Sequence, residues 1–252
     1  MRTNVEHIVD PAAPGSLVPP AATGSAPEVL SGSPSPELAA EMREVGERLE
    51  GAEPAEVLSW AVERFGDGLV LASSFQDCVL VDLAVAVEPR IRVVFLDTGF
   101  HFPETLAYLR RIERRYGLNL LVVEPELPPD VAPCGTPGCC QLRKVEPLSR
   151  ALAGAKAWVT GLKRVDTPER ANAPVVGWDG TKRLVKVNPI AAWTEDDVER
   201  YVVDRGLPRH PLSYVGYASI GCAPTTSPVA EGDDPRAGRW RGSDKTECGL
   251  HL

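Results

Sequence analysis

The chain has 252 residues, of which 43% are hydrophobic and 25% charged, so it can bury the core of one large globular domain or two small ones. Its formal net charge of −8 argues against general nucleic-acid binding, which requires a basic surface, but allows a local basic pocket for a small anion. No apolar run is long enough to span a bilayer, and residues 1–10 lack the apolar stretch of a secretory signal. We therefore expect a cytoplasmic protein with no membrane or nucleic-acid partner.

Residues 1–36 are rich in Pro, Gly, Ala and Ser. Such a segment buries too little apolar surface to offset the entropy of ordering, so we predict that it is disordered. Helical patterns follow at residues 37–50 and 54–65, and the second opens at Pro54, a favourable first-turn position. We assign residues 37–252 to one domain, which ends in a mobile tail from about residue 228.

From residue 69 onward, apolar runs of strand length alternate with helical patterns. We predict strands at 69–73, 91–96, 118–123, 157–160 and 184–187, and helices at 76–87, 103–116, 140–153 and 194–205. This alternation is typical of βαβ units, so the expected fold is α/β, with a mostly parallel sheet flanked by helices. Ligands of such sheets bind at the carboxyl ends of the strands.

The polar residues Ser73, Ser74, Gln76 and Asp77 follow the first predicted strand and precede a helix. Exposed N–H groups and the helix dipole at that position favour a phosphate or sulfate. The structural alternative is that Ser74 only caps the helix. The chain has no G-x-x-x-x-G-K-[ST] motif, which argues against a Walker-type NTPase.

Two further polar segments follow predicted strands. Asp97 and Thr98 come after the second strand, where Asp97 could bind a ribose hydroxyl or simply belong to an ordinary turn. Arg164 and Arg170 come after the fourth strand, and arginines there suit bidentate contacts to phosphate or sulfate. Their alternative is a solvated loop.

The six cysteines include the adjacent pair Cys139 and Cys140 in a long chain without a secretory signal, which favours a metal or redox role over disulfides. Arg143 and Lys144 lie on the next turn of the expected helix and could offset thiolate and substrate charge. An iron–sulfur cluster generally requires four thiolates, and Cys222 supplies only a third. Cys78 lies on an apolar stretch and is interpreted as a buried small hydrophobe.

The last cysteine, Cys248, lies four residues from the end of the chain among cationic residues. Lys245 and His251 are close in sequence, and Arg236 and Arg239 lie just upstream. Cationic neighbours raise the thiolate fraction, and the thiolate is the attacking species. We therefore predict that Cys248 is a catalytic nucleophile on the tail.

Together these segments resemble the sulfonucleotide reductases of assimilatory sulfate reduction, from about residue 69 to the C-terminus. The matching segments are Ser73–Asp77, Leu96–Gly99, Cys139–Lys144, Thr160–Arg164, Asn188–Pro189 with Trp193, Arg236–Trp240 and Lys245–His251. The paired cysteines resemble the branch of the family that reduces adenosine 5′-phosphosulfate (APS) and carries a [4Fe-4S] cluster. The resemblance implies an adenine-nucleotide α-hydrolase-like fold related to that of PP-loop ATP pyrophosphatases.

The resemblance also implies a two-step reaction. Cys248 attacks the sulfur of APS and displaces AMP, and reduced thioredoxin then releases sulfite from the S-sulfonated cysteine. Cys139, Cys140 and Cys222 would hold the cluster. The implied substrate contacts are Ser73, Ser74, Gln76, Asp77, Asp97, Thr98, Arg143, Lys144, Arg164, Arg170, Arg236, Arg239 and His251.

One departure from the family pattern concerns the cluster. Thr225 stands where the family has the second cysteine of a Cys-x-x-Cys segment, and a hydroxyl is a poor iron ligand beside a thiolate. Three outcomes remain open: a cluster bound through three cysteines, substitution by Cys134 as the fourth ligand, or no stable cluster.

Other functions also remain open at this point. The enzyme alternative is a reductase of 3′-phosphoadenosine 5′-phosphosulfate (PAPS), which would need a further basic contact for the 3′-phosphate. The non-catalytic alternative is a degenerate nucleotide-binding homologue that lost turnover with its fourth cluster cysteine. Thr225 favours this non-catalytic hypothesis, and the intact Cys248 tail argues against it.

Overall fold

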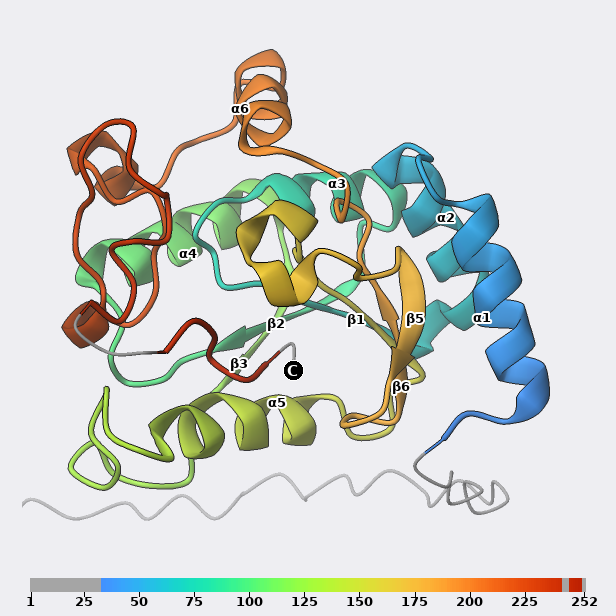
Figure 1. The fold of residues 1–252 in the computed structure, drawn as a ribbon, viewed down its shortest axis with the longest axis horizontal. Helices are drawn as coiled ribbons and strands as arrows, with labels where there is room; N and C mark the ends of the chain where they lie inside the picture. The colour runs from blue at the N-terminus through green and yellow to red at the C-terminus, as the bar shows by residue number, and fades with distance from the viewer. Residues whose placement is uncertain (1–32, 242–244, 251–252) are drawn as a thin grey trace, which may run out of the picture. The chain divides into compact units, whose positions relative to one another are not determined.

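The computed structural model describes residues 33–241 and 245–250 (Figure 1). The disorder expected for residues 1–36 falls mainly outside these ranges, as does the expected contact His251. Helices α1 (Pro36–Arg48) and α2 (Pro54–Phe65) match the two predicted N-terminal helices, and each has proline in its first turn. The hydroxyl of Ser35 accepts a hydrogen bond from the Leu38 N–H and so caps α1.

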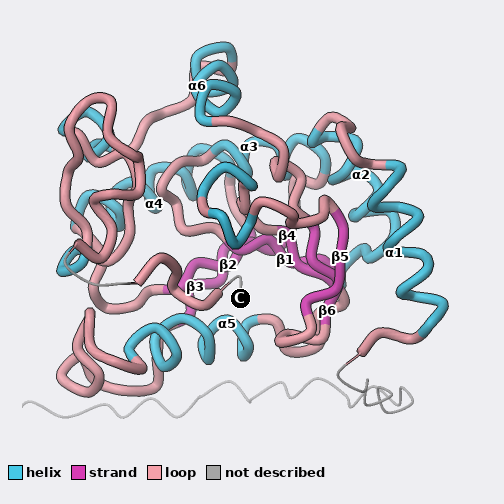
Figure 2. The backbone as a smooth tube through the Cα atoms, in the orientation of Figure 1, coloured by secondary structure: helices cyan, strands magenta, loops and turns pink. Residues whose placement is uncertain are grey.

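Six strands form one sheet in the order β3-β2-β1-β4-β6-β5 (Figure 2). Neighbouring strands are parallel except for β5 and β6, which are antiparallel. The strands are β1 (Leu69–Ala72), β2 (Arg92–Leu96), β3 (Asn119–Val123), β4 (Ala157–Val159), β5 (Val176–Asp179) and β6 (Leu184–Val187). The predicted mostly parallel α/β sheet is therefore confirmed.

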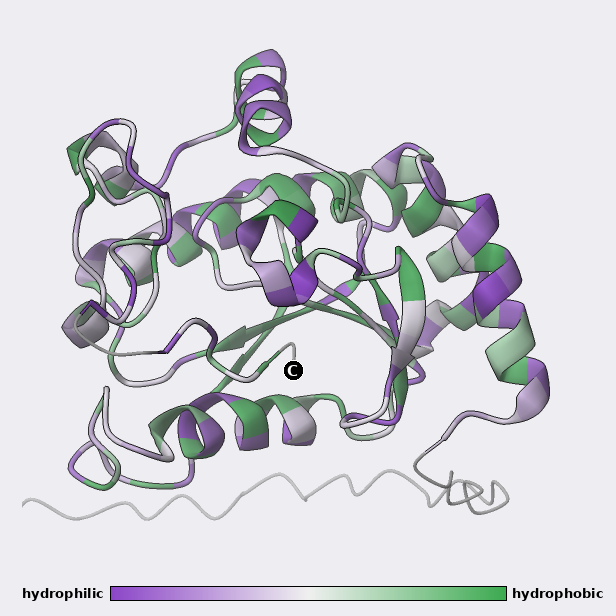
Figure 3. Ribbon diagram, in the orientation of Figure 1, coloured by the Kyte–Doolittle hydropathy of each residue, from purple (hydrophilic) through white to green (hydrophobic). Residues whose placement is uncertain are grey.

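Helices cover both faces of the sheet (Figures 1 and 3). Leu69 and Leu71 of β1 pack into the larger core with α1 to α4, and Val70 packs on the opposite face against α5. This alternation follows from the period of two in a strand, and burial on both faces explains why the strand is apolar throughout. The remaining helices are α3 (Val79–Val87), α4 (Pro103–Tyr116), α5 (Glu146–Ala151) and α6 (Glu195–Asp204).

Three elements differ from the sequence-based prediction. The strand β5 was not predicted, because a short edge strand containing glycine carries little strand signal. The helix predicted at 140–153 divides into a π-helical turn at Gln141–Val145 followed by the short helix α5. The helix predicted from residue 76 begins at Val79, because the Asp77 carboxylate accepts the Val79 N–H and leaves residues 73–77 as a loop.

The strand order reverses direction at β1. The chain passes from β1 to β2 on one side, and β4 later pairs with β1 on the other. Such a switch point opens a crevice at the carboxyl ends of the two strands, between the loops that leave them. No helix in the described ranges is long and apolar enough to cross a membrane.

Candidate active site

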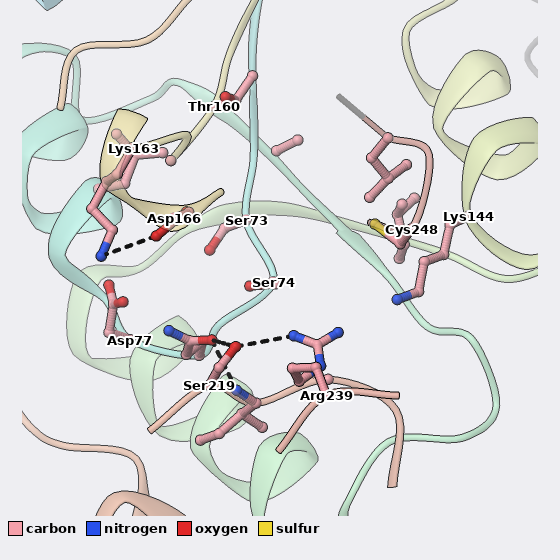
Figure 4. A pocket seen from close by; sticks show the side chains of 18 of the residues that line it. Ser73, Ser74, Asp77, Lys144, Thr160, Lys163, Asp166, Ser219, Arg239 and Cys248 are labelled. Carbon is pink, nitrogen blue, oxygen red and sulfur yellow. Dashed lines mark hydrogen bonds and ion pairs between the residues drawn. The ribbon is translucent and has the colours of Figure 1, made fainter. Parts of the chain in front are cut away.

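A cavity of about 240 Å³ lies at the carboxyl ends of β1 and β4. The residues that line it come from the loop after β1, the segment after β4, the π-helical turn and the C-terminal segment. Figure 4 shows Lys144, Arg239 and Cys248 at one end of this cavity and Asp77, Lys163 and Asp166 at the other. The cavity is thus cationic around a thiol at one end and mixed in charge at the other.

The loop at residues 73–77 has an unusual backbone conformation. Phe75 adopts a φ of 53° while its side chain is fully buried against Phe95. A left-handed conformation is costly for a bulky residue, and such strain concentrates at functional sites. The conformation lets the Ser73 hydroxyl accept the Phe75 N–H and leaves Ser74 exposed at the cavity.

The same loop is joined to a distant segment that closes the cavity. The side-chain oxygen of Gln76 accepts the Ile220 N–H at 2.9 Å. Burial raises the pKa of Asp77 at the other end of the loop, although the Val79 N–H and the charge of Lys163 partly offset this effect. Gln76 and Asp77 therefore line the cavity and also fix the position of its walls.

A chain of ion pairs runs along one wall of the cavity. Lys163 pairs with Glu195 and with Asp166, and Asp166 pairs with Arg170 at 2.7 Å. This series of ion pairs ends at the C-terminal segment of the protein, where Arg170 Nε lies 2.6 Å from Glu247 Oε1. Because both side chains of this last pair are nearly buried, it fixes the residue before Cys248.

The C-terminal segment lies against the cavity. Arg236 Nη2 donates to the Thr246 carbonyl at 3.1 Å, and Leu250 packs against the smaller core cluster, which includes Leu148 of α5. These contacts, with the Glu247 ion pair, place the Cys248 thiol in the cavity wall. The segment expected to form a tail is therefore folded onto the site in this structure.

The side chain of Arg239 reaches the cavity by passing close to the backbone of Gly221. Its guanidinium stacks on Trp240 at 4.5 Å and donates to the Ser219 hydroxyl at 3.1 Å. A Cβ atom at residue 221 would lie 2.2 Å from Arg239 Nη2, so Gly221 is required for this approach. The position of the arginine depends on a glycine that the sequence analysis treated only as part of a cysteine segment.

Lys144 lies near Cys248 at the cavity wall (Figure 4), and its amine is influenced by the charges of three cysteines. Burial lowers the pKa of Lys144, but the negative charges that Cys222, Cys248 and Cys140 carry as thiolates outweigh this effect, so the pKa is raised overall. The amine is therefore protonated at neutral pH. A protonated amine at this position favours negative charge at the thiol end of the cavity.

Of the cysteines expected at a cluster, Cys222 lies on the tight turn that Cys134 contacts through Thr225. Cys222 lies beside Thr98, with 3.5 Å between Sγ and Oγ1, and Cys134 Sγ lies 3.7 Å from Oγ1 of Thr225, which is on the same turn as Cys222. The neighbouring Cys134 thiol and the charge of Lys144 lower the pKa of Cys222 despite its burial. Lys245 Nζ lies 3.1 Å from the Cys140 sulfur.

This group of thiols fits an iron–sulfur cluster in its chemistry. All six cysteines are free, and thiolates are the ligands that iron–sulfur clusters use. In residues 33–241 and 245–250, no three His, Cys, Asp or Glu side chains converge closely enough for a single metal ion. A cubane cluster spaces its ligand sulfurs more widely than a single ion does, so this observation and the cluster are compatible.

Ten expected residues line the cavity, and three do not. Asp97 lies outside it, and its carboxylate accepts the Gly99 N–H at 2.9 Å. Arg164 points away and pairs with Glu50 at 2.6 Å. Neither side chain lines the cavity in this structure, so we leave both out of the proposed substrate contacts. The residues that line it as expected are Ser73, Ser74, Gln76, Asp77, Thr98, Lys144, Arg170, Arg236, Arg239 and Cys248.

Arg143 is the third expected residue that does not line the cavity. Its side chain is 1% exposed and donates to the carbonyls of Thr98, Pro128, Val131 and Ala132 at 2.6 to 3.2 Å. With all its donors directed at backbone, it holds the loop before Cys134 rather than an anion. Sequence position alone does not distinguish an arginine that faces backbone from one that faces a ligand.

The cavity wall also contains residues that were not predicted as site residues from the sequence. Those with polar or charged side chains are His101, Thr105, Thr160, Lys163, Asp166, Glu195, Ser219 and Glu247. Lys163, Asp166 and Glu247 are joined in the chain of ion pairs, which brings together residues far apart in sequence. The one local signal was the position of Lys163 beside Arg164 after β4.

Comparison with known proteins gives consistent matches. Residues 68–228 match the model of the phosphoadenosine phosphosulfate reductase domain family. The chain is 48% identical over 225 residues to adenosine 5′-phosphosulfate reductase from Mycolicibacterium smegmatis, covering 84% of this chain and 95% of the relative. It is 46% identical over 224 residues to the enzyme of that name from Streptomyces coelicolor, with 85% and 95% covered.

Solved structures agree in fold. A phosphoadenylyl-sulfate reductase from Candida auris, in a phosphate complex, superposes with a TM-score of 0.65 at 26% identity, covering 78% of this chain and 98% of the other. An FMN adenylyltransferase from Candida glabrata superposes with a TM-score of 0.56 at 14% identity, covering 82% and 78%, which shows the fold alone. The expected relationship to adenine-nucleotide enzymes is confirmed at the level of fold.

Proposed function

The chain belongs to the phosphoadenosine phosphosulfate reductase family, and on this premise we propose that it reduces APS to sulfite and AMP in assimilatory sulfate reduction. The observation that carries the proposal is the Cys248 thiol in the cavity wall beside Lys144 and Arg239 (Figure 4). A thiol among cations in a crevice at the switch point of an α/β sheet suits attack on a bound anion.

The two ends of the cavity suggest how the substrate lies. The sulfate is placed at the cationic end, near Cys248, Lys144 and Arg239, and the nucleoside toward Thr160 and Lys163. The loop after β1 lies between the two ends, where its N–H groups suit the phosphate. The proposed contacts are Ser73, Ser74, Gln76, Asp77, Thr98, Lys144, Arg170, Arg236 and Arg239.

In the first proposed step, the Cys248 thiolate attacks the sulfur of the sulfate group. The new S–S bond forms as the bond from sulfur to the bridging oxygen breaks, and AMP leaves with that electron pair. Charge grows on the AMP phosphate during this step. Lys144 and Arg239 offset charge in the closed cavity, where preorganised cations are most effective.

In the second step, a thiolate of reduced thioredoxin attacks Cys248 Sγ, and sulfite leaves with the electron pair of the S–S bond. The second thioredoxin thiol then resolves the mixed disulfide and restores the Cys248 thiol. Thioredoxin is oxidised to its disulfide while the substrate sulfur gains two electrons. Because the Glu247 ion pair holds Cys248 in the cavity, the segment must release before thioredoxin can reach it.

Cys139, Cys140 and Cys222 are proposed to hold a [4Fe-4S] cluster. When bound, the cluster would add negative charge beside Lys144 and keep its amine protonated. The chain itself keeps that amine near Cys248 and the sulfate end of the cavity. Free thiols and a thioredoxin donor both suit a reducing cytoplasm, where we place the protein.

The test combines mass spectrometry with sulfite release by anaerobically purified protein. With APS but no thioredoxin, the wild type should accumulate one SO₃ adduct on Cys248, and reduced thioredoxin should then release sulfite. Cys248→Ser should form no adduct while still binding AMP, and Cys78→Ala removes a thiol outside the cavity as the control. Unchanged sulfite release by Cys248→Ser would refute the mechanism, and turnover only with PAPS would reassign the substrate.

A further inference from the structure

We propose that Cys134 supplies the fourth thiolate of the iron–sulfur cluster, in place of Thr225. The inference rests on the proposed function, because it takes the cluster from that proposal. It concerns a position where this chain departs from the cysteine pattern of the family. Three observations on the described residues support it.

The first observation is the position of Thr225. It ends the 3₁₀ turn Ala223–Thr225, and its N–H donates to the Cys222 carbonyl at 3.1 Å. Residues 222 and 225 therefore lie on the same tight turn, as the two ends of a Cys-x-x-Cys segment would. A neutral hydroxyl is a far weaker ligand for iron than a thiolate, so the turn supplies one good ligand and lacks the other.

The second observation is that Cys134 occupies the space next to Thr225. The distance from Cys134 Sγ to Thr225 Oγ1 is 3.7 Å, although the two residues are 91 positions apart. A Cβ atom on the neighbouring Gly135 would lie 3.3 Å from the Thr225 methyl group, so the two backbones approach closely. The sulfur of Cys134 therefore lies next to Thr225, the position at which the family pattern has a cysteine.

The third observation is that hydrogen bonds hold the loop containing Cys134 in a defined conformation. Arg143 binds the carbonyls of Pro128, Val131 and Ala132, and Ala132 has a φ of 52°, which costs energy for a residue with a Cβ. The Thr136 N–H and hydroxyl both donate to the Pro133 carbonyl. The surrounding contacts thus over-determine a strained loop that presents Cys134.

The loop also connects Cys134 to the cysteine pair. The Cys139 N–H donates to the Thr136 carbonyl at 3.2 Å, and Cys139 itself is buried. Cys134, Cys139 and Cys140 therefore come from one short hydrogen-bonded segment, and Cys222 comes from the turn packed against it. These four thiols satisfy the requirement of a [4Fe-4S] cluster for four thiolates.

The experiment measures iron and acid-labile sulfide per chain, with EPR and Mössbauer spectra, in the full-length protein purified anaerobically. The variants are Cys134→Ser, Thr225→Cys and the combination of both. We expect four iron atoms in the wild type and conversion of Cys134→Ser to a three-iron cluster or apoprotein. Thr225→Cys in the Cys134→Ser background should restore the four-iron cluster, because it returns a thiolate to the same corner.

The rescue variant separates ligation from folding. If Cys134→Ser only disturbed the loop, Thr225→Cys would not restore the iron content, and that result would overturn the proposal. An unchanged four-iron spectrum in Cys134→Ser would also overturn it. A wild type that reduces APS but binds no iron would refute the ligand and leave the proposed function intact. A cluster that depends on Cys134 in a protein inactive toward APS would support the ligand and refute the proposed function.

Discussion

The Glu247 carboxylate forms a buried ion pair with Arg170, in which Oε1 lies 2.6 Å from Nε and Oε2 accepts from Nη2 at 2.8 Å. Burial alone would raise the pKa of Glu247, but the hydrogen bond and charge of Arg170 and the charge of Arg236 outweigh it, so the pKa is lowered. The pair joins the segment after β4 to the residue before Cys248. It therefore acts as a latch that holds the nucleophile in the cavity.

Glu247→Gln is predicted to open this latch. Loss of the carboxylate leaves Arg170 without its buried partner, so amide hydrogen exchange in residues 245–250 should accelerate at least about tenfold. Glu231→Gln, at an exposed carboxylate in the preceding loop, is the matched control and should leave the exchange unchanged. Equal protection in both variants would show that the ion pair does not hold the segment.

Lys144→Gln is predicted to slow formation of the Cys248 adduct by about a hundredfold in single turnover, because a preorganised charge is lost beside the reacting group. AMP affinity should fall much less, since the charge acts mainly as the sulfate group reacts. Lys156→Gln is the control, because Lys156 is exposed just before β4, at the opposite end of that strand. If KM rose with an unchanged rate, Lys144 would contribute to binding alone.

Arg143→Lys should lower the free energy of unfolding by about 3 kcal/mol, because several buried carbonyls lose their donors. AMP affinity should stay close to that of the wild type, since Arg143 does not line the cavity. Arg150→Lys, on an exposed arginine paired with Glu126, should change stability by no more than about 0.5 kcal/mol. Denaturant unfolding and AMP titration measure both. Normal stability with lost AMP affinity would restore Arg143 as a substrate contact.

His210 should make the fold sensitive to acid. Its Nδ1 accepts the Leu212 N–H and its Nε2 faces the Thr105 hydroxyl, and burial lowers its pKa from 6.5 to about 4. Since the folded pKa is depressed, the unfolded chain binds the proton first. Stability is fully present above pH 6.5 and falls toward pH 4, by about 3 kcal/mol from this group.

Urea unfolding at a series of pH values measures this effect against His210→Asn. The variant should be less stable at pH 7, because packing is lost, but its stability should decline less between pH 6.5 and 4. The difference between the two proteins isolates the histidine from the carboxylates, which titrate in both. Parallel curves would show that His210 does not contribute to the acid sensitivity.

Local patterns were enough to predict most of the fold. Apolar runs such as those of β1 (Leu69–Ala72) and residues 93–96 of β2 are recognisable because strand segments buried on both faces are apolar throughout. The helices α2 and α4 carry proline at their starts, a signal confined to a few residues. The strand β5 escaped prediction because its four residues become a strand only by pairing with β6.

Within the candidate site, too, some residues were predictable from local sequence and others were not. The loop at residues 73–77 was predictable because it follows a strand at the edge where an α/β sheet binds its ligand. The cation Lys144 was predictable because it lies one helical turn after the cysteine pair. Arg143 and Arg164 lie outside the cavity for one reason: an arginine side chain is long, and tertiary packing determines its partner. In one case the partner is backbone and in the other Glu50, which is 114 residues away.

The sequence by itself determined the class of fold, the family and the cysteine that carries the proposed chemistry, because periodicity and short motifs are local properties of the chain. Only the tertiary structure decided which side chains meet. The pairs Glu247 with Arg170 and Cys134 with Thr225 join residues 77 and 91 positions apart. Such contacts depend on how the loops at the sheet edge pack, and no local pattern encodes that packing.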